Sequence, residues 1–459
     1  MPDVVGACRL LVRKAQNWLT SMPLIGDWPQ KTGRTKSRAF PKDLAKVVIG
    51  RWDSFVSGSD YVRPPRPPDR LFRELLEIAY ICGGLPEENR YPQFNIVAVP
   101  ISDAAKNRYV GDIWYFNEPR PLSIDEIRRL APAADFKKSG ILVKWDSTQL
   151  QVAGLVDFGT SWSRARIGLQ YHYQFPNCLF VQLDRPGRIK IYQGQYLVAA
   201  LADGQLDRHK GLDFNLTLHD VSHRGLSKIW RAIIPPKEES GRDYDGFLFM
   251  SFWNIFGAMA NCISEAGHGG AIVIVPKHKT VPERQIRIKY RQNSSILREA
   301  YISFMNVRNR VIDFVIRAEG GDESKKGEWA RAELQLSECH LRLVEAVRFV
   351  AKLSGCDGAI VISNDLQLLG FGAEIRAELK SGTKVREIKD EMRRIYGSLD
   401  AEQFGQRHRS AIKLVSQRPD YLVLVISQDG PISVVRSELH KFVDVKKGAN
   451  FANMNMPFA

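Results

Sequence analysis

The chain has 459 residues, which is enough for two or three domains with large cores, and 44% of its residues are hydrophobic, as in ordinary soluble proteins. Six cysteines are scattered without a CxxC pair, so neither a disulfide framework nor a zinc site is indicated, and a reducing cytoplasm is expected. The net charge of +15 favours anionic partners.

Residues 1–68 form a basic leader, with twelve lysines and arginines against five acidic residues. No charged segment precedes an apolar core at the N-terminus, so a secretory signal is not expected. The basic cluster at 31–38 lacks interleaved aromatic residues, which favours a solvated leader over a nucleic-acid-binding arm. Arg63-Pro64-Pro65-Arg66-Pro67-Pro68 predicts a polyproline II linker that closes this region at residue 68.

Residues 69–330 predict an α+β region. Asp69 caps an amphipathic helix over 69–81, and Ser123 with Glu126 forms a capping box at the start of a second helix. Runs rich in β-branched and aromatic residues predict further strands at 94–99, 112–116, 141–145, 150–158, 178–183, 188–192 and 271–275.

Two stretches inside this region require a choice. The uncharged run 247–263 is shorter than a membrane span and contains two asparagines, so a buried core helix is predicted and no membrane partner is expected. Gly267-His268-Gly269-Gly270 lacks the Lys-Ser/Thr of a P-loop and the GxGxxG spacing. A helix C-cap with close backbone packing is therefore favoured over a phosphate loop.

A helix over 331–353 leads to Asp357-Gly358, which precede a buried strand at 359–363. A carboxylate at such a helix-to-strand turn projects into a cleft, and a glycine lets a ligand approach the backbone. Hard cations such as Mg²⁺ or Mn²⁺ bind carboxylates together with phosphate oxygens. A metal site with phosphates is therefore predicted here.

The second cluster is Gly405-Gln406-Arg407-His408-Arg409, which precedes a stretch of helical composition. Free N–H groups at a helix N-terminus attract anions, and two guanidinium groups add bidentate phosphate contacts. The intervening charged sequence at 384–394 also has helical composition. A buried strand follows at 421–426, and Ser427 and Asp429 after it are predicted to join the same cleft.

These segments, in this order, resemble the diadenylate cyclase domain, whose signatures are a DGA triplet and a (G)TRHR segment followed by a Ser-Glu-Glu-like strand end. Asp357-Gly358-Ala359 match the first signature; Gly405, Arg407, His408, Arg409 and Ala411 match the second. The resemblance implies a metal, Mg²⁺ or Mn²⁺, on Asp357 and also on Asp429, and a catalytic grip on the triphosphate by Arg407, His408 and Arg409. It further implies nucleotide contacts from Gly358, Ala359, Gly405, Gln406 and Ser427.

The resemblance implies an α/β fold in which a mixed central sheet flanked by helices forms a cyclase-like domain at 331–445, before a tail at 446–459. The region 69–330 resembles the probable sensor modules of the DACNV type, chiefly through the GHGG-strand segment and the preceding β meander. The implied activity is condensation of two ATP molecules into cyclic di-AMP by catalytic domains that meet face to face in a homodimer or higher oligomer, regulated by an unidentified small molecule or protein.

Two alternatives stay open. Gln406 stands where the family has threonine, and Ser427-Gln428-Asp429 replaces Ser-Glu-Glu. A catalytically weak domain that only senses nucleotides is therefore one alternative. The other is a nucleic-acid-binding regulator that acts through the basic leader, with an affinity that falls steeply with salt.

Overall fold

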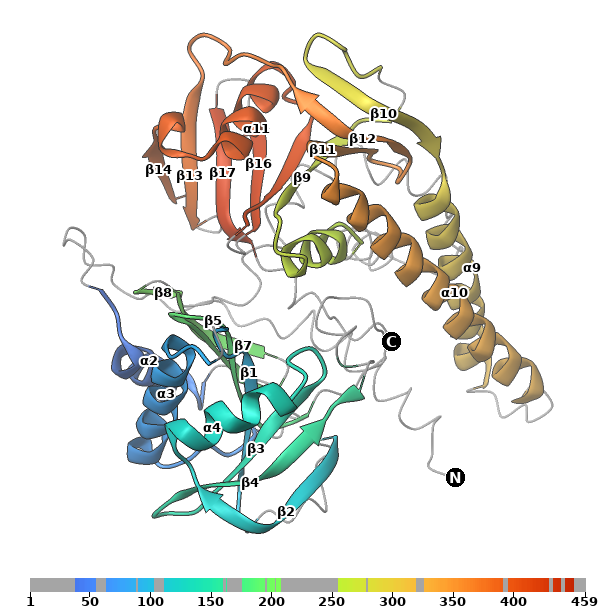
Figure 1. Ribbon diagram of the computed structural model, residues 1–459. Helices are drawn as coiled ribbons and strands as arrows, with labels where there is room; N and C mark the ends of the chain where they lie inside the picture. Colours follow the sequence, from blue (N-terminus) through green and yellow to red (C-terminus); the bar gives the residue numbers. More distant parts are fainter. Residues whose placement is uncertain are drawn as a thin grey trace.

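The structure is a computed structural model. It describes residues 38–54, 63–87, 90–102, 111–159, 162, 176–194, 196–202, 204–207, 255–277, 280–318, 326–390, 395–428, 432–438 and 442–449. Within these ranges the chain forms two mixed sheets with helices packed against them, which confirms the predicted α/β class (Figure 1).

The first unit is built on an eight-stranded sheet in the order β2-β4-β3-β1-β5-β6-β7-β8. Only β1 and β3 run parallel, and the remaining neighbours are antiparallel. Helices α2, α3 and α4 contribute to the core on one face of this sheet (Figure 1). The elements are α2 (Pro41–Arg51), α3 (Asp69–Gly84), β1 (Phe94–Pro100), β2 (Asp112–Pro121), α4 (Ile124–Leu130), β3 (Ser139–Trp145), β4 (Leu150–Asp157), β5 (Leu179–Arg185), β6 (Arg188–Gln193), β7 (Tyr196–Ala202) and β8 (Gln205–Asp207).

The second unit is built on a nine-stranded sheet in the order β10-β12-β11-β9-β15-β16-β17-β13-β14. Its parallel pairs are β9 with β11 and β13 with β17. The elements are β9 (Gly270–Val275), β10 (Ile286–Ser294), α9 (Ile296–Ala318), α10 (Lys326–Lys352), the short helix η3 (Leu353–Gly355), β11 (Ala359–Ser363), β12 (Leu368–Ile375), β13 (Lys384–Asp390), β14 (Ile395–Leu399), the short helix η4 (Ala401–Gln403), α11 (Gln406–Gln417), β15 (Leu422–Ile426), β16 (Ile432–Glu438) and β17 (Phe442–Ala449).

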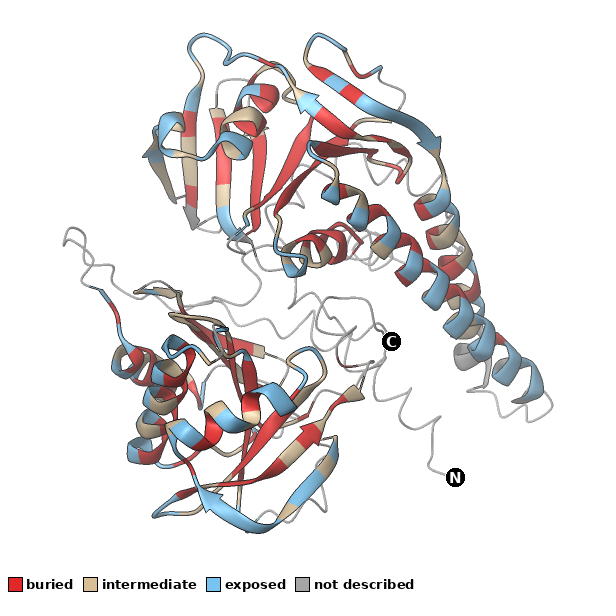
Figure 2. Ribbon diagram, in the orientation of Figure 1, coloured by how far each residue is buried: buried red, intermediate tan, exposed pale blue. Residues whose placement is uncertain are grey.

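The centre of the second sheet is apolar on both faces. Every residue of β9, β11 and β15 is buried. Figure 2 shows the strands at the centre of this sheet mostly in red. Alternate residues serve different cores: Ile272 and Ile274 pack with α9, α10 and the helix at 255–265, whereas Val273 packs with α11. Burial on both sides explains why these strands are uninterrupted apolar runs in the sequence.

The start of the first unit differs from the expected leader and linker. Helix α2 lies within residues 1–68, yet its Leu44 and Val48 are fully buried in the first core. The indole N–H of Trp52 donates to the carbonyl of Pro64 at 3.0 Å, and Pro64 and Pro67 are buried. The proline segment is therefore packed against the unit, because the Pro64 carbonyl accepts from a buried tryptophan and two of its prolines are buried. The basic cluster at 31–37 lies outside the described residues.

The second unit also differs from its expected limits. The boundary expected at residue 330 falls between α9 and α10, which pack together, and β9 and β10 belong to the same sheet as β11. Residues 384–390 form strand β13, where a helical segment was expected, because they pair in parallel with β17. Of the predicted core helix at 247–263, residues 255–263 are described; they are helical and most of them are buried, whereas 247–254 lie outside the described residues. No helix among the described residues combines the length and apolar composition needed to cross a bilayer.

Candidate functional site

Three chain segments meet at one edge of the second sheet. Strands β9 and β11 are parallel neighbours and therefore begin at the same edge. Strand β15 runs antiparallel to β9, with Ile426 opposite Gly270, so it ends at that edge. Neighbouring strands of a sheet lie about 4.8 Å apart. The residues before β9, before β11 and after β15 therefore lie side by side at this edge. We refer to this place as the β9–β11–β15 edge.

The Asp357-Gly358 turn occupies the β11 position of this edge, where η3 gives way to the strand as predicted. Asp357 is exposed. Gly358 has a φ of 118°, and a Cβ added to it would lie 2.5 Å from the carbonyl carbon of Gly372. Only glycine fits this conformation and this close approach. Ala359 is 3% exposed within the core beside α11, so its side chain lies away from solvent.

Helix α11 presents the basic triplet, and its first turn begins at Gly405, as predicted. Gly405 supplies no side-chain cap, so the first N–H groups of this helix have no capping acceptor from that residue. Gln406 and Arg407 are exposed. The guanidinium of Arg407 donates from Nη2 to the carbonyl of His268 at 3.3 Å and thereby joins α11 to the turn before β9.

The other two members of the triplet point elsewhere. His408 is half-buried; its Nε2 lies 3.0 Å from the hydroxyl of Ser433, and its ring stacks on Phe404. Burial, reinforced by the nearby Lys447 ammonium group, lowers the pKa of His408 below its usual value of 6.5. Arg409 donates from Nη1 to Glu402 at 3.0 Å. Arg407 is thus the triplet side chain tied to the β9–β11–β15 edge.

The turn before β9 is a part of this site that the sequence interpretation assigned to the sensor region. Gly269 has a φ of 66°, and a Cβ on it would lie 2.8 Å from the carbonyl oxygen of Ile426 and 3.0 Å from Nη1 of Arg407. The expected close packing is present, and its partners are the end of β15 and the α11 arginine. The glycines before an apolar run were the available signal, but nothing local in the sequence identified those partners.

Ser427 is half-buried directly after β15, and Gln428 follows it, exposed. Asp429 lies outside the described residues. Within the ranges that the structure describes, no three His, Cys, Asp or Glu side chains form a group that could enclose a metal ion. Mg²⁺ commonly binds through one or two carboxylates together with water and substrate phosphates. Among the described residues of this edge, the exposed carboxylate of Asp357 fits that mode.

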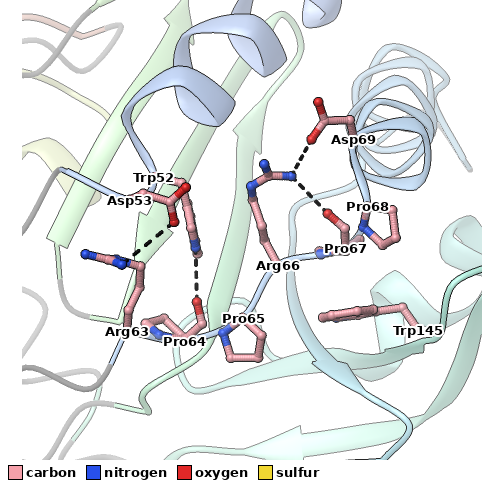
Figure 3. A pocket seen from close by; sticks show the side chains of 10 residues that line it. All are labelled: Trp52, Asp53, Arg63, Pro64, Pro65, Arg66, Pro67, Pro68, Asp69 and Trp145. Carbon is pink, nitrogen blue, oxygen red and sulfur yellow. Dashed lines mark hydrogen bonds and ion pairs between the residues drawn. The ribbon is translucent and has the colours of Figure 1, made fainter.

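The first unit has a pocket of its own, with a volume of about 550 Å³ (Figure 3). It lies between the proline segment, the end of α2, the start of α3 and Trp145 at the end of β3. Arg66 donates to Asp69 at 2.7 Å and to the carbonyl of Pro67, whereas Arg63 lies 3.8 Å from the exposed Asp53. Arg66 is therefore fixed in the pocket wall by two hydrogen bonds, whereas Arg63 has a longer contact with an exposed carboxylate.

Comparison with known families identifies part of the chain. Residues 62–157 match the family described as "Probable sensor domain DACNV". The match covers α3, β1, β2, α4, β3 and β4, and the GHGG segment lies outside it. No curated protein and no solved structure matches the chain. The first unit therefore contains the sensor-like segment. This segment lies at the beginning of the region 69–330, for which the sequence analysis indicated a sensor module.

Proposed function

We propose that the second unit is a diadenylate cyclase domain, which joins two ATP molecules into cyclic di-AMP and releases two pyrophosphates. The observation that carries this proposal is the meeting of the Asp357-Gly358 turn and Arg407 at the β9–β11–β15 edge. The DACNV match supports it, since that sensor domain is associated with diadenylate cyclase proteins. The first unit would then provide regulatory input.

The chemistry suits the residues at this edge. The 3′-hydroxyl of each ATP attacks the α-phosphorus of the other; the new P–O bond forms as the bond to pyrophosphate breaks, and the hydroxyl proton passes to solvent water. Asp357 would hold the cation that accompanies the phosphates. A bound Mg²⁺ or Mn²⁺ supplies positive charge to the phosphate oxygens. Arg407 and the N–H groups of the first α11 turn would stabilise the charge on the departing pyrophosphate.

The direct test is incubation of the full chain with ATP and either Mg²⁺ or Mn²⁺, with the products separated by chromatography and identified by mass. Wild-type protein should form cyclic di-AMP, and Asp357→Asn should lose at least about a hundredfold in rate because the carboxylate charge is removed. Asp125→Asn changes an exposed acid of α4 in the same way and should retain full activity. Equal activity of Asp357→Asn and wild type would contradict the proposed role.

A second candidate is a nucleotide-binding domain without turnover, favoured by Gln406 and Gln428 at positions where the family differs. Binding of Mg²⁺-ATP by the wild type without any cyclic product, with either metal and in a confirmed dimer, would support this candidate. Titration calorimetry with ATP therefore accompanies the product assay. The nucleic-acid alternative concerns the basic leader, whose residues 1–37 lie outside the described ranges.

A further inference from the structure

An aromatic side chain borders the candidate site and belongs to neither signature. Tyr290 lies in β10, the edge strand of the second sheet, and is 44% exposed, whereas Ile286 and Ile288 of the same strand are 0% and 6% exposed. Its ring stacks on Phe371 of β12, with centroids 4.8 Å apart and planes inclined by 23°. The Lys289 ammonium group lies over the same ring, 5.3 Å from its centroid, and the side chain stays 44% exposed beside both neighbours.

Glycines bring this ring next to the Asp357-Gly358 turn. A Cβ added to Gly372 would lie 3.1 Å from Cδ2 of Tyr290 and 3.5 Å from the carbonyl oxygen of Asp357. The ring and the turn therefore border the same small space over β12. Gly358 itself approaches the backbone of Gly372, so no side chain separates the two features. Any larger residue at 372 would stand between the ring and the turn.

Sheet order places the relevant groups in one row. The strands follow in the order β10, β12, β11 and β9. The ring of Tyr290 lies on β10, and the turn with Asp357 precedes β11. The turn before β9 contains His268, whose carbonyl accepts from Arg407. An aromatic surface, a carboxylate and a guanidinium in that order match a ligand with a flat base at one end and phosphates at the other.

We propose that Tyr290, supported by Phe371, is the surface on which the base of the bound nucleotide stacks. This proposal rests on the proposed function, because it assumes a nucleotide at the β9–β11–β15 edge. Stacking uses the flat face that every base has, so Tyr290 contributes affinity without distinguishing adenine from guanine. Discrimination between bases is then left to other groups.

The test measures binding without turnover, using the full chain, Mg²⁺ and α,β-methylene-ATP, whose α–β linkage cannot release pyrophosphate. Tyr290→Ala should weaken binding about tenfold, and Tyr290→Phe should bind like the wild type. The corresponding guanosine analogue should lose affinity to a similar degree. Tripolyphosphate with Mg²⁺, which has no base, should bind Tyr290→Ala and wild type equally. Tyr290→Leu retains an apolar cover over Phe371 and should behave like Tyr290→Ala.

Tyr115 provides a matched control, because it is also an exposed tyrosine of an edge strand, β2, with a lysine ammonium group 4.6 Å from its centroid. Tyr115→Ala should leave nucleotide binding unchanged. Unchanged nucleotide affinity in Tyr290→Ala, or an equal loss for tripolyphosphate, would overturn the proposal. Nucleotide binding by the wild type without cyclic product would overturn the cyclase alone, and a wild type that binds no nucleotide would overturn both.

Discussion

His408 gives α11 a pH-sensitive contact with Ser433 of β16. Burial lowers its pKa in the folded chain, whereas in the unfolded chain the imidazole titrates near 6.5. Between these two values the unfolded state binds more protons than the folded state, so the free energy of unfolding falls as the pH falls through about 6.5. The stabilising contribution is complete above that value, where the ring is neutral in both states.

We therefore expect His408→Gln to reduce the loss of stability between pH 7.5 and 5.5. Urea unfolding of the wild type and the variant at a series of pH values measures this difference. Ser433→Ala retains the imidazole and its burial, so it should keep most of the wild-type pH dependence. Identical slopes for His408→Gln and the wild type would show that another group causes the dependence.

Local sequence predicted the secondary-structure positions of single residues where local geometry decides them. Asp357 and Gly358 lie at a helix-to-strand turn, and Arg407 lies in the first turn of α11, as expected. The triplet was interpreted as one clamp, but successive helical residues point about 100° apart. Arg407 therefore contacts the turn before β9, whereas His408 contacts β16, and adjacency in sequence did not place their side chains together.

At the scale of secondary structure, β13 illustrates what local composition cannot reveal. The guanidinium of Arg386 makes two bonds to Asp444 of β17, at 2.8 and 3.1 Å, and Asp444 is 0% exposed. The same guanidinium lies 4.0 Å from the ring centroids of both Tyr396 and Phe442. The charged residues of this segment have helical composition, so a helix was predicted. The sequence near them does not reveal the buried partner of Arg386, which is 58 positions further along the chain.

Removal of this contact should destabilise the second unit. Arg386→Ala deletes the bidentate partner of a fully buried carboxylate, so we expect the free energy of unfolding to fall by about 3 kcal/mol. Denaturant unfolding followed by circular dichroism measures the change. The double variant Arg386→Met with Asp444→Leu removes both charges and should recover much of the loss. A loss in the double variant equal to or greater than that of Arg386→Ala would contradict this account.

Other elements were predicted because their signals are local. Strands β9, β11 and β15 are continuous apolar runs that can be predicted without knowing a distant partner. The same holds for the cap of α4, where Ser123 accepts from the Glu126 N–H at 3.2 Å. Helix α2 was missed because its apolar face is short and is followed by the proline segment. Its contribution depends on packing against α3 and β7, which the sequence does not display.

At the scale of the whole molecule, the two sheets bury separate sets of apolar side chains among the described residues. The buried clusters of the first sheet contain no residue from the second, so each unit buries its own apolar surface. The sequence anticipated two structured regions but divided them near residue 330. The parallel pairing of β9 with β11 crosses that position, and a long helical crossover hides the relation between two such strands in the sequence.

The proposed reaction predicts an effect of concentration at this scale. Each catalytic domain is expected to hold one ATP, so two protomers must meet before the bonds of cyclic di-AMP can form. Activity per protomer should therefore fall on dilution, in parallel with the dimer fraction measured by analytical ultracentrifugation. Activity per protomer that stays constant at concentrations where the chain is monomeric would exclude a shared site.

The arrangement of the second sheet also determines when it can form during synthesis. Its three fully buried strands come from residues 270–275, 359–363 and 422–426, and β9 lies between the other two. When β9 leaves the ribosome, neither neighbouring strand has yet been translated. Pairing across such long separations is slow, and an unpaired apolar strand tends to aggregate. The first unit can fold while translation continues, whereas the apolar strands of the second unit stay unpaired until residues 422–426 have emerged.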